Sequence, residues 1–188
     1  LAAVLAGRRE QAPAAWKAFE EDFCRILPEF AGLDFRDAGD GRVELVARLA
    51  GGDERVAADS LSQGTLYLLA TLALAHAPVP PTVVCIEEAD RGVHPRMLRE
   101  VRDALYRLSY PQDAGMERAA VQVITTTHSP YLLDLFKDHP EEVVLASKAG
   151  NAATFMRLSE RTDLLDLMKE AHLGDLWYSG ILGGIPGE

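Results

Sequence analysis

Residues 83–88 read Val-Val-Cys-Ile-Glu-Glu, an apolar run that ends in two adjacent acids. The run from Thr82 to Ile86 is short and β-branched, which is typical of a fully buried strand. In an open α/β sheet, ligands bind beyond the carboxyl ends of the strands, where Glu87 and Glu88 would lie. One carboxylate there can hold Mg²⁺ while its neighbour orients or deprotonates a water molecule. The alternative is a helix N-terminus whose acids complement the helix dipole.

A second polar cluster follows the next predicted strand. Val121 to Thr125 reads as another buried strand, and residues 126–130, Thr-Thr-His-Ser-Pro, come directly after it. A histidine at a strand tip can hydrogen-bond a terminal phosphate or an attacking water molecule, so His128 is a candidate catalytic residue. The alternative is a structural histidine that caps the next helix together with Ser129.

A third cluster, residues 61–65, reads Leu-Ser-Gln-Gly-Thr and precedes an apolar helix predicted over Leu66–Ala77. The hydroxyl of Ser62 and the backbone N–H groups of Gly64 and Thr65 would point out of the helix N-terminus. Such a terminus is a ready anion site. The alternative is that Ser62 only caps the helix.

The pattern after Ser60 indicates an α/β fold with a mostly parallel core sheet, because strand, helix, strand, helix and strand alternate. Besides the elements above, we expect helices over Pro95–Ser109 and Pro130–Phe136, and strands over Val143–Ser147 and Thr154–Leu158 around a Gly150-Asn151 turn.

The pattern before Ser60 is different. Leu1–Ala6 is predicted to be the end of a helix that stops at Gly7, and Pro13–Leu27 has helical spacing. A period of two from Leu33 to Ala58 predicts a small antiparallel β-meander. We therefore divide the chain into a helical segment plus meander, residues 1–59, and a core lobe, residues 60–188. The Gly-rich end, Leu173–Glu188, is expected to be a docked or mobile tail.

The composition limits the class of protein. The 188 residues are 48% apolar and 26% charged, as in one globular domain or one lobe of a larger one. The net charge of −10 argues against coating nucleic acid by bulk electrostatics, although a local basic stripe is compatible with it. Cys24 and Cys85 fit a reducing, cytoplasmic compartment. The longest apolar run has about half of the roughly 20 residues that a membrane span needs.

Two other chemistries fit the sequence less well. The five histidines are not placed at zinc-ligand spacing. Ser129, His128 and Asp134 are too close in sequence for a hydrolase triad, and the chain has no Gly-x-Ser-x-Gly elbow. The three polar clusters are therefore the candidate site.

The order and spacing of these clusters carry a family resemblance. The chain resembles the C-terminal half of an ABC-type ATPase head, in the RecF and structural-maintenance-of-chromosomes branch. Within that branch it looks most like the AAA-labelled bacterial ATPases related to the overcoming-lysogenization-defect nucleases. Leu61–Thr65 is similar to the ABC signature, Ile86–Pro95 to the Walker B motif and D-loop, and Gln122–Pro130 to the switch-histidine strand. The tail Leu173–Pro186 is also similar to the ends of such proteins.

The resemblance implies a C-terminal lobe of a P-loop NTPase, with ATP and Mg²⁺ as cofactors. Glu87 would take the metal-linked position, Glu88 would be the catalytic base, and His128 would sense the γ-phosphate. The signature residues, which are Ser62, Gln63 and Gly64, would contact a nucleotide held by the opposite subunit. The D-loop, from Gly92 to His94, would link the two sites. ATP would then hold two heads together as a homodimer, and hydrolysis would release them.

The sequence departs from the family pattern in several places. Glu87 stands where transporters usually have Asp, Ala89 replaces the usual Pro, and Arg91 replaces the usual Asn. The chain has no Gly-x-x-x-x-Gly-Lys-Ser/Thr sequence, which supplies the phosphate cradle of a P-loop. We therefore expect a missing N-terminal Walker A half, either cut away or encoded separately.

Two functions from different classes follow. The first is ATP hydrolysis coupled to head dimerisation in DNA repair or phage defence, with DNA or a nuclease as a further partner. The second is a non-catalytic regulatory module that pairs with a competent ATPase, as the missing P-loop suggests. The residues contain no nuclease metal cluster, so a nuclease would have to be a partner.

Overall fold

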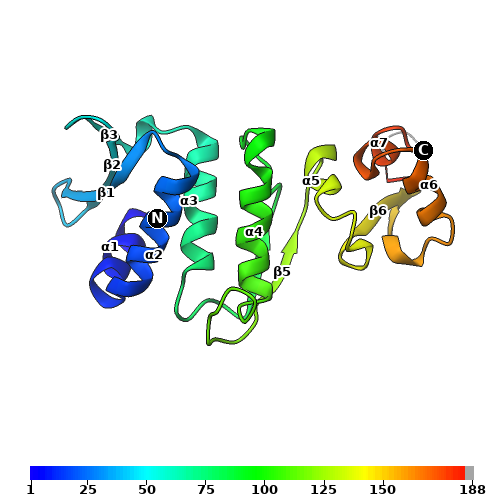
Figure 1. Cartoon of the computed structure of the whole chain (residues 1–188), viewed down its shortest axis with the longest axis horizontal. Helices are drawn as coiled ribbons and strands as arrows, with labels where there is room; N and C mark the ends of the chain where they lie inside the picture. The colour runs from blue at the N-terminus through cyan, green and yellow to red at the C-terminus, as the bar shows by residue number, and fades with distance from the viewer. Residues whose placement is uncertain (185–188) are drawn as a thin grey trace. The chain divides into compact units, whose positions relative to one another are not determined.

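The computed structural model describes residues 1–184 and contains helices, short 3₁₀ turns (η) and strands (Figure 1). In chain order the elements are α1 Ala2–Gln11, α2 Pro13–Ile26, β1 Phe30–Asp37, β2 Val43–Leu49, β3 Arg55–Ala57, η1 Ala58–Ser60, α3 Gln63–Ala75, β4 Val83–Ile86, η2 Pro95–Met97, α4 Leu98–Ser109, β5 Gln122–Thr125, α5 Pro130–Asp134, η3 Pro140–Glu142, β6 Val144–Ala149, β7 Ala152–Arg157, η4 Leu158–Glu160, α6 Leu164–Glu170 and α7 Leu173–Tyr178. The chain divides into two compact units, residues 1–126 and residues 127–188. The division predicted after residue 59 separates sequence patterns and stays a prediction.

The first unit begins with two helices packed on an antiparallel meander. Pro13 starts α2, and the buried side chains of Trp16, Phe19 and Phe23 recur at helical spacing along it. The strands pair in the order β1-β2-β3, with Phe35 opposite Leu45. The predicted α2 and the predicted antiparallel meander are therefore confirmed.

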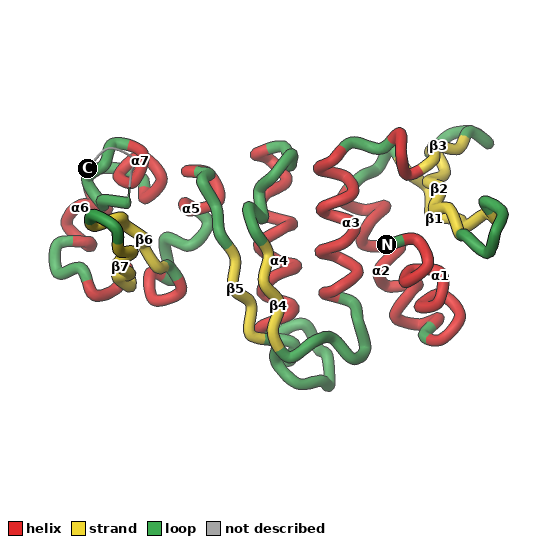
Figure 2. The backbone as a smooth tube through the Cα atoms, turned by 180° about the vertical axis from the view of Figure 1, so that it is seen from behind, coloured by secondary structure: helices red, strands yellow, loops and turns green. Residues whose placement is uncertain are grey.

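The rest of the first unit is a parallel strand pair with two helices. α3 is apolar on most sides and largely buried, and it lies beside the amphipathic α4 (Figure 1). Figure 2 shows β4 and β5 running next to each other, and their register places Ile86 opposite Thr125. Because the strands are parallel, the residues that follow each of them emerge at the same end.

The predicted core sheet was mostly parallel, but the parallel sheet has fewer strands than expected. Within residues 1–184, parallel pairing joins only β4 and β5. β6 pairs with β7 in antiparallel fashion, because Gly150 and Asn151 form a tight turn that leaves no room for a crossover. The two parallel strands are also less buried than predicted, since Val83 is 47% and Ile124 52% exposed. The pair thus has one open face.

The helix expected to end at Gly7 instead continues to Gln11. A glycine inside a helix costs only about 1 kcal/mol, which tertiary contacts can offset. Leu5 is buried, and the guanidinium group of Arg8 donates a hydrogen bond to the backbone carbonyl of Ala73 on α3. These contacts anchor both halves of α1.

The second unit is built around buried leucines from several of its helices and turns and from β6. They are Leu133, Leu145, Leu158, Leu164, Leu173, Leu176 and Leu182. α7 packs on α5, where Asp134 Oδ1 accepts the backbone N–H of Gly174 at 2.7 Å. The predicted tail therefore docks through α7 and Leu182, and residues 185–188 of that prediction lie outside the described residues. None of the helices in residues 1–184 has the length and apolarity to cross a membrane.

An ionic network joins three helices of the first unit. Asp22 on α2 accepts hydrogen bonds from Arg107 on α4 and, at 3.1 Å, from Arg25, and its Oδ2 lies 2.9 Å from Nε2 of His76. Arg25 also donates to Glu100 on α4 at 3.0 Å. Burial alone would raise the pKa of Asp22, but the hydrogen bonds from Arg107 and His76 lower it to about 2. Burial lowers the pKa of His76.

We predict that Asp22→Asn destabilises the first unit by about 2–3 kcal/mol near neutral pH, because it weakens hydrogen bonds to charged partners. The native pKa of Asp22 is below its ordinary value, so its contribution is present above about pH 4 and is lost as the pH falls toward 2. Urea denaturation, followed by Trp16 fluorescence in a Trp177→Phe background, measures the difference at several pH values.

The matched control is Asp103→Asn, which removes an exposed partner of Arg102 on the same unit. An exposed ion pair contributes about 0–1 kcal/mol, so this variant should stay close to the parent at every pH. If Asp22→Asn lowers the free energy of unfolding by no more than the control does, the structural role of the network is contradicted.

Candidate functional site

The first part of the site is the N-terminus of α3. Ser62 is the N-cap, and its Oγ accepts the backbone N–H of Thr65 at 3.1 Å and lies 2.8 Å from Thr65 Oγ1. Capping is therefore a real role of Ser62. The capping bond does not use the N–H groups of Gln63 and Gly64, which belong to the first turn and have no acceptor within the helix. Ser62 and Gln63 are exposed, whereas Gly64 is buried.

Gly64 is buried because the backbone of Gly92 lies directly against it. A Cβ atom on Gly64 would be 2.1 Å from the carbonyl oxygen of Gly92, closer than atoms can approach. Gly92 has φ +68°, a left-handed conformation that glycine adopts without strain. The turn before it is closed by hydrogen bonds from Arg91 N to Glu88 O (2.8 Å) and from Val93 N to Asp90 O (3.0 Å). The structure thus brings the signature-like segment and the D-loop-like turn together.

The paired acids follow β4. Glu87 is exposed and Glu88 is half-buried. Glu88 has φ +48°, an unusual conformation for a residue other than glycine, and such strain is concentrated at functional sites. Thr126, the residue after β5, stabilises this conformation. Glu88 N donates to Thr126 Oγ1 (3.0 Å), and Ala89 N donates to Thr126 O (3.1 Å).

Thr126 and Arg91 also belong to this site, although no role was predicted for either from the sequence. Thr126 is the residue after β5 that holds the backbone of Glu88 and Ala89. Arg91 Nε lies 3.9 Å from Glu88 Oε2, so a guanidinium group accompanies the predicted base. The signal for Thr126 was its place after a strand parallel to β4, because the carboxyl ends of parallel strands share an edge.

Two predicted site residues, His94 and His128, are histidines in different structural environments. His94 precedes η2, and its Nδ1 accepts the backbone N–H of Arg96 at 3.2 Å. His128 is exposed and belongs to the second unit, which begins at Thr127, the residue after Thr126. The neighbouring Ser129 caps α5 by accepting the N–H of Leu132 at 3.3 Å, so capping falls to Ser129.

The carboxylates fit Mg²⁺ only as part of a larger site. Within residues 1–184, no three His, Cys, Asp or Glu side chains are grouped to hold a metal ion. Mg²⁺ usually keeps several waters and takes one or two carboxylates together with substrate phosphates. Glu87, exposed at the end of β4, fits that single-ligand role.

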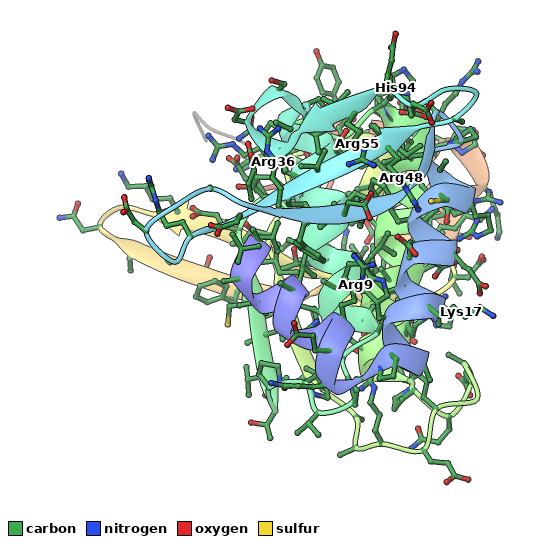
Figure 3. All side chains as sticks on the ribbon, turned by 90° about the vertical axis from the view of Figure 1, so that its left-hand side faces the viewer. Arg9, Lys17, Arg36, Arg48, Arg55 and His94 are labelled. Atoms are coloured by element: carbon green, nitrogen blue, oxygen red, sulfur yellow. The ribbon has the colours of Figure 1, made fainter. Side chains whose placement is uncertain are left out.

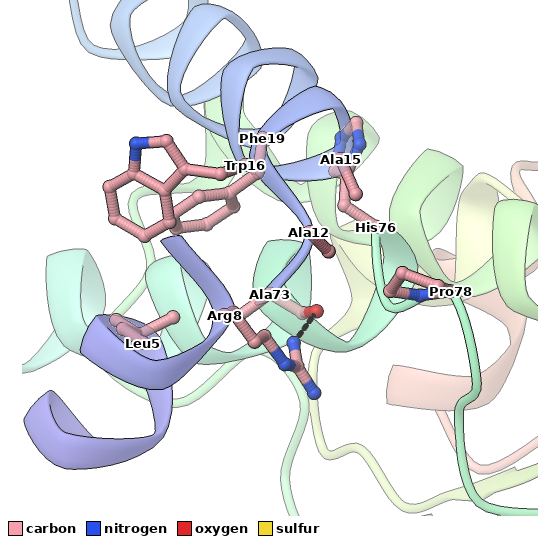
Figure 4. Close-up of a pocket in the computed structure, with 9 residues that line it drawn as sticks. All are labelled: Leu5, Arg8, Ala12, Ala15, Trp16, Phe19, Ala73, His76 and Pro78. Carbon is pink, nitrogen blue, oxygen red and sulfur yellow. Dashed lines mark hydrogen bonds between the residues drawn. The ribbon is translucent and has the colours of Figure 1, made fainter. Parts of the chain in front are cut away.

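A small cavity lies elsewhere in the first unit, between α1, α2 and α3 (Figure 4). Leu5, Trp16 and Phe19 are among its lining residues, and its volume of about 10 Å³ is room for about one water molecule. The cavity is therefore too small for a nucleotide.

We predict that Gly64→Ala destabilises the first unit by about 1–3 kcal/mol, because the added methyl group would collide with the backbone of Gly92. The control is Gly7→Ala in α1, where an added Cβ meets only the end of the Gln11 side chain at 4.0 Å. That variant should gain about 0.5–1 kcal/mol. Urea denaturation measures both, and equal effects would argue against the contact between Gly64 and Gly92.

The comparisons with known proteins agree with this reading. A family model described as "AAA domain, putative AbiEii toxin, Type IV TA system" matches residues 6–134, a range that includes every predicted site residue. No match is found among the curated proteins.

A solved structure is similar in fold. It comes from work titled "Structural biochemistry of ATP-driven dimerization and DNA stimulated activation of SMC ATPases". The TM-score is 0.56 at 14% identity, over 89% of this chain and 99% of that chain. The predicted resemblance to an ABC- and SMC-like ATPase domain is confirmed: the chain belongs to the family of AAA domains that the matching family model describes.

Proposed function

We propose that this chain is the carboxyl half of an ATPase head that binds and hydrolyses ATP while two heads dimerise in the cytoplasm. The observation that carries the proposal is the packing of Gly64 on Gly92, which joins an exposed helix N-terminus to the turn after the paired acids. Membership of the AAA-domain family supports nucleotide chemistry in general. DNA repair or phage defence is the proposed setting, with DNA or a nuclease as a further partner.

Each residue has a proposed task in phosphoryl transfer, which needs positioning and neutralisation of charge. Ser62, Gln63 and Gly64 would meet the γ-phosphate of a nucleotide held by a second copy of the head. The N–H groups and dipole of the helix N-terminus suit that task. Gly92 and His94 would couple the two nucleotide sites of the dimer, because the backbone of Gly92 packs on Gly64 in the first turn of α3.

The remaining tasks concern the attacking water molecule. Glu87 would hold Mg²⁺, which neutralises phosphate charge when bound. Glu88 would position and deprotonate the water, with its backbone held by Thr126. His128 would sense the γ-phosphate. Arg91, whose Nε lies 3.9 Å from Glu88 Oε2, would help to orient this carboxylate.

The phosphates of the chain's own nucleotide would be held by the Walker A half, which we propose as an obligatory partner. Two observations support an incomplete site: the sequence has no P-loop, and the β4-β5 pair exposes Val83 and Ile124 on one face. The missing P-loop also favours the second candidate, a non-catalytic module that pairs with a competent ATPase.

The first experiment is calorimetric titration of this chain with Mg-ATP, for which we predict no measurable binding. The reason is that the chain lacks the P-loop lysine and backbone cradle. The fold can be checked beforehand by circular dichroism. Micromolar binding would contradict the composite site and require a different location for the nucleotide.

The second experiment tests Glu88 once the Walker A half has been supplied in the same or a second chain. We predict that Glu88→Gln lowers ATP turnover by at least a hundredfold, because it removes the base, while ATP still produces a dimer. Steady-state phosphate release and size-exclusion chromatography measure these effects. Turnover near the unmodified value would refute the role of Glu88, and absence of turnover in the unmodified complex would favour the non-catalytic module.

A further inference from the structure

The chain that follows His128 is fixed by local hydrogen bonds in the second unit. Thr127 Oγ1 accepts the backbone N–H of Ser129 at 3.0 Å, and Ser129 Oγ accepts the N–H of Leu132 at 3.3 Å. Pro130 restricts Ser129 to an extended conformation, which has φ −95° and ψ 114° here. Because the His128 side chain is exposed, its position depends mainly on this backbone.

Gly174 of α7 lies directly against the start of α5. A Cβ atom on Gly174 would be 2.3 Å from the carbonyl oxygen of Pro130 and 2.8 Å from its carbonyl carbon, closer than atoms can approach. Gly174 lies inside α7 and has no left-handed φ, so glycine is required here for space and not for its conformation. The backbone of α7 is therefore in contact with the residue two positions after His128.

Asp134 joins the other end of α5 to the same glycine. Its Oδ1 accepts the backbone N–H of Gly174 at 2.7 Å. The first N–H groups of a helix have no acceptor inside the helix, and a carboxylate is a strong acceptor for them. Since α5 runs from Pro130 to Asp134, Gly174 contacts α5 at both of its ends.

These two contacts fix a position that the apolar core of the unit leaves open. Leu173 and Leu176 of α7 are 1% and 3% exposed and belong to one core with Leu133 of α5. Apolar burial is non-directional, so it holds the two helices together without fixing how far one slides along the other. A hydrogen bond depends steeply on distance and angle. The contacts with Gly174 therefore fix α5, and with it the segment that carries His128.

We propose that Gly174 and Asp134 are positioning residues for His128, so that the tail of the chain serves the nucleotide site as well as the core. This role rests on the proposed function, in which His128 senses the γ-phosphate. A histidine hydrogen-bonds a phosphate oxygen only over a donor–acceptor distance of about 2.7–3.2 Å. A displacement of α5 by about 1 Å would remove that contact, and a misplacement of this size can lower a rate about a hundredfold.

The test uses the complex that contains the Walker A half, in which kcat and KM for ATP are measured by phosphate release. We expect Gly174→Ala to lower kcat about tenfold or more, because the added methyl group pushes Pro130 away. KM should stay within about threefold of the parent value, since the Walker A half binds the nucleotide and His128 acts in the reaction. Far-UV circular dichroism checks that the variant is folded.

Asp134 provides a second variant that adds no bulk, which keeps the test decisive if Gly174→Ala does not fold. Asp134→Ala removes the acceptor of the Gly174 N–H group and should also lower kcat. Asp134→Asn keeps a side-chain oxygen that can accept this N–H group, so it should restore most of the lost kcat.

Two comparisons separate positioning from a loss of stability. Gly183→Ala is the matched control, because it strains a residue of the same tail (φ +77°) whose added Cβ would lie 4.0 Å from Ser147 Oγ and away from α5. Its kcat should stay within about twofold of the parent value. In a His128→Ala background, Gly174→Ala should lower kcat no further, because the effects of residues that act as a unit are not additive.

The positioning role is overturned if Gly174→Ala and Asp134→Ala both leave kcat at the parent value, or if the Gly183→Ala control loses as much. It is also overturned if the effects of His128→Ala and Gly174→Ala are additive. A failure of the proposed function would look different, as an unmodified complex without turnover or as a His128→Ala variant with the parent kcat. Either of those results would refute the γ-phosphate role of His128 and the positioning role together.

Discussion

Parallel pairing of β4 with β5 is the constraint on which the candidate site depends. It places the residue after β5, Thr126, beside the acids that follow β4, and the Thr126 hydroxyl and carbonyl then hold the turn at Glu88 and Ala89. An antiparallel pair would send the two segments to opposite ends of the sheet. The left-handed conformation of Glu88 persists because these bonds offset its cost, which is of order 1–3 kcal/mol.

The same turn determines how α3 is placed. Gly92 presents its backbone to Gly64 at a distance that no side chain would allow, so two glycines far apart in sequence act as one packing unit. A conformational change in the turn after Glu87 and Glu88 would therefore move the N-terminus of α3. This contact gives the signature-like and D-loop-like segments a physical connection within one chain.

Charge is distributed unevenly over the first unit. Asp22 collects arginines in short, hydrogen-bonded contacts that bind helices together. Asp34 lies near three arginines, Arg9, Arg48 and Arg55, at longer distances of 3.6–4.0 Å (Figure 3). The first arrangement stabilises the fold, because buried charges require close partners.

The sequence by itself determined the elements and the candidate residues. Helical and alternating periodicity predicted α2, α4 and the meander, since these patterns follow from burying one face of each element. The clusters around Ser62, Glu88 and His128 were recognised by residue type and spacing. Helix ends were less predictable. The helix was expected to stop at Gly7, but the free-energy cost of a glycine inside a helix is small compared with the contribution of tertiary contacts.

Only the tertiary structure decided which of these residues meet. Sequence could not tell that Thr126 would hold Glu88 or that Gly64 would touch Gly92. Such contacts join segments dozens of residues apart, and they depend on register and on backbone approach. Periodicity records which face of an element is buried, but it does not record what covers that face.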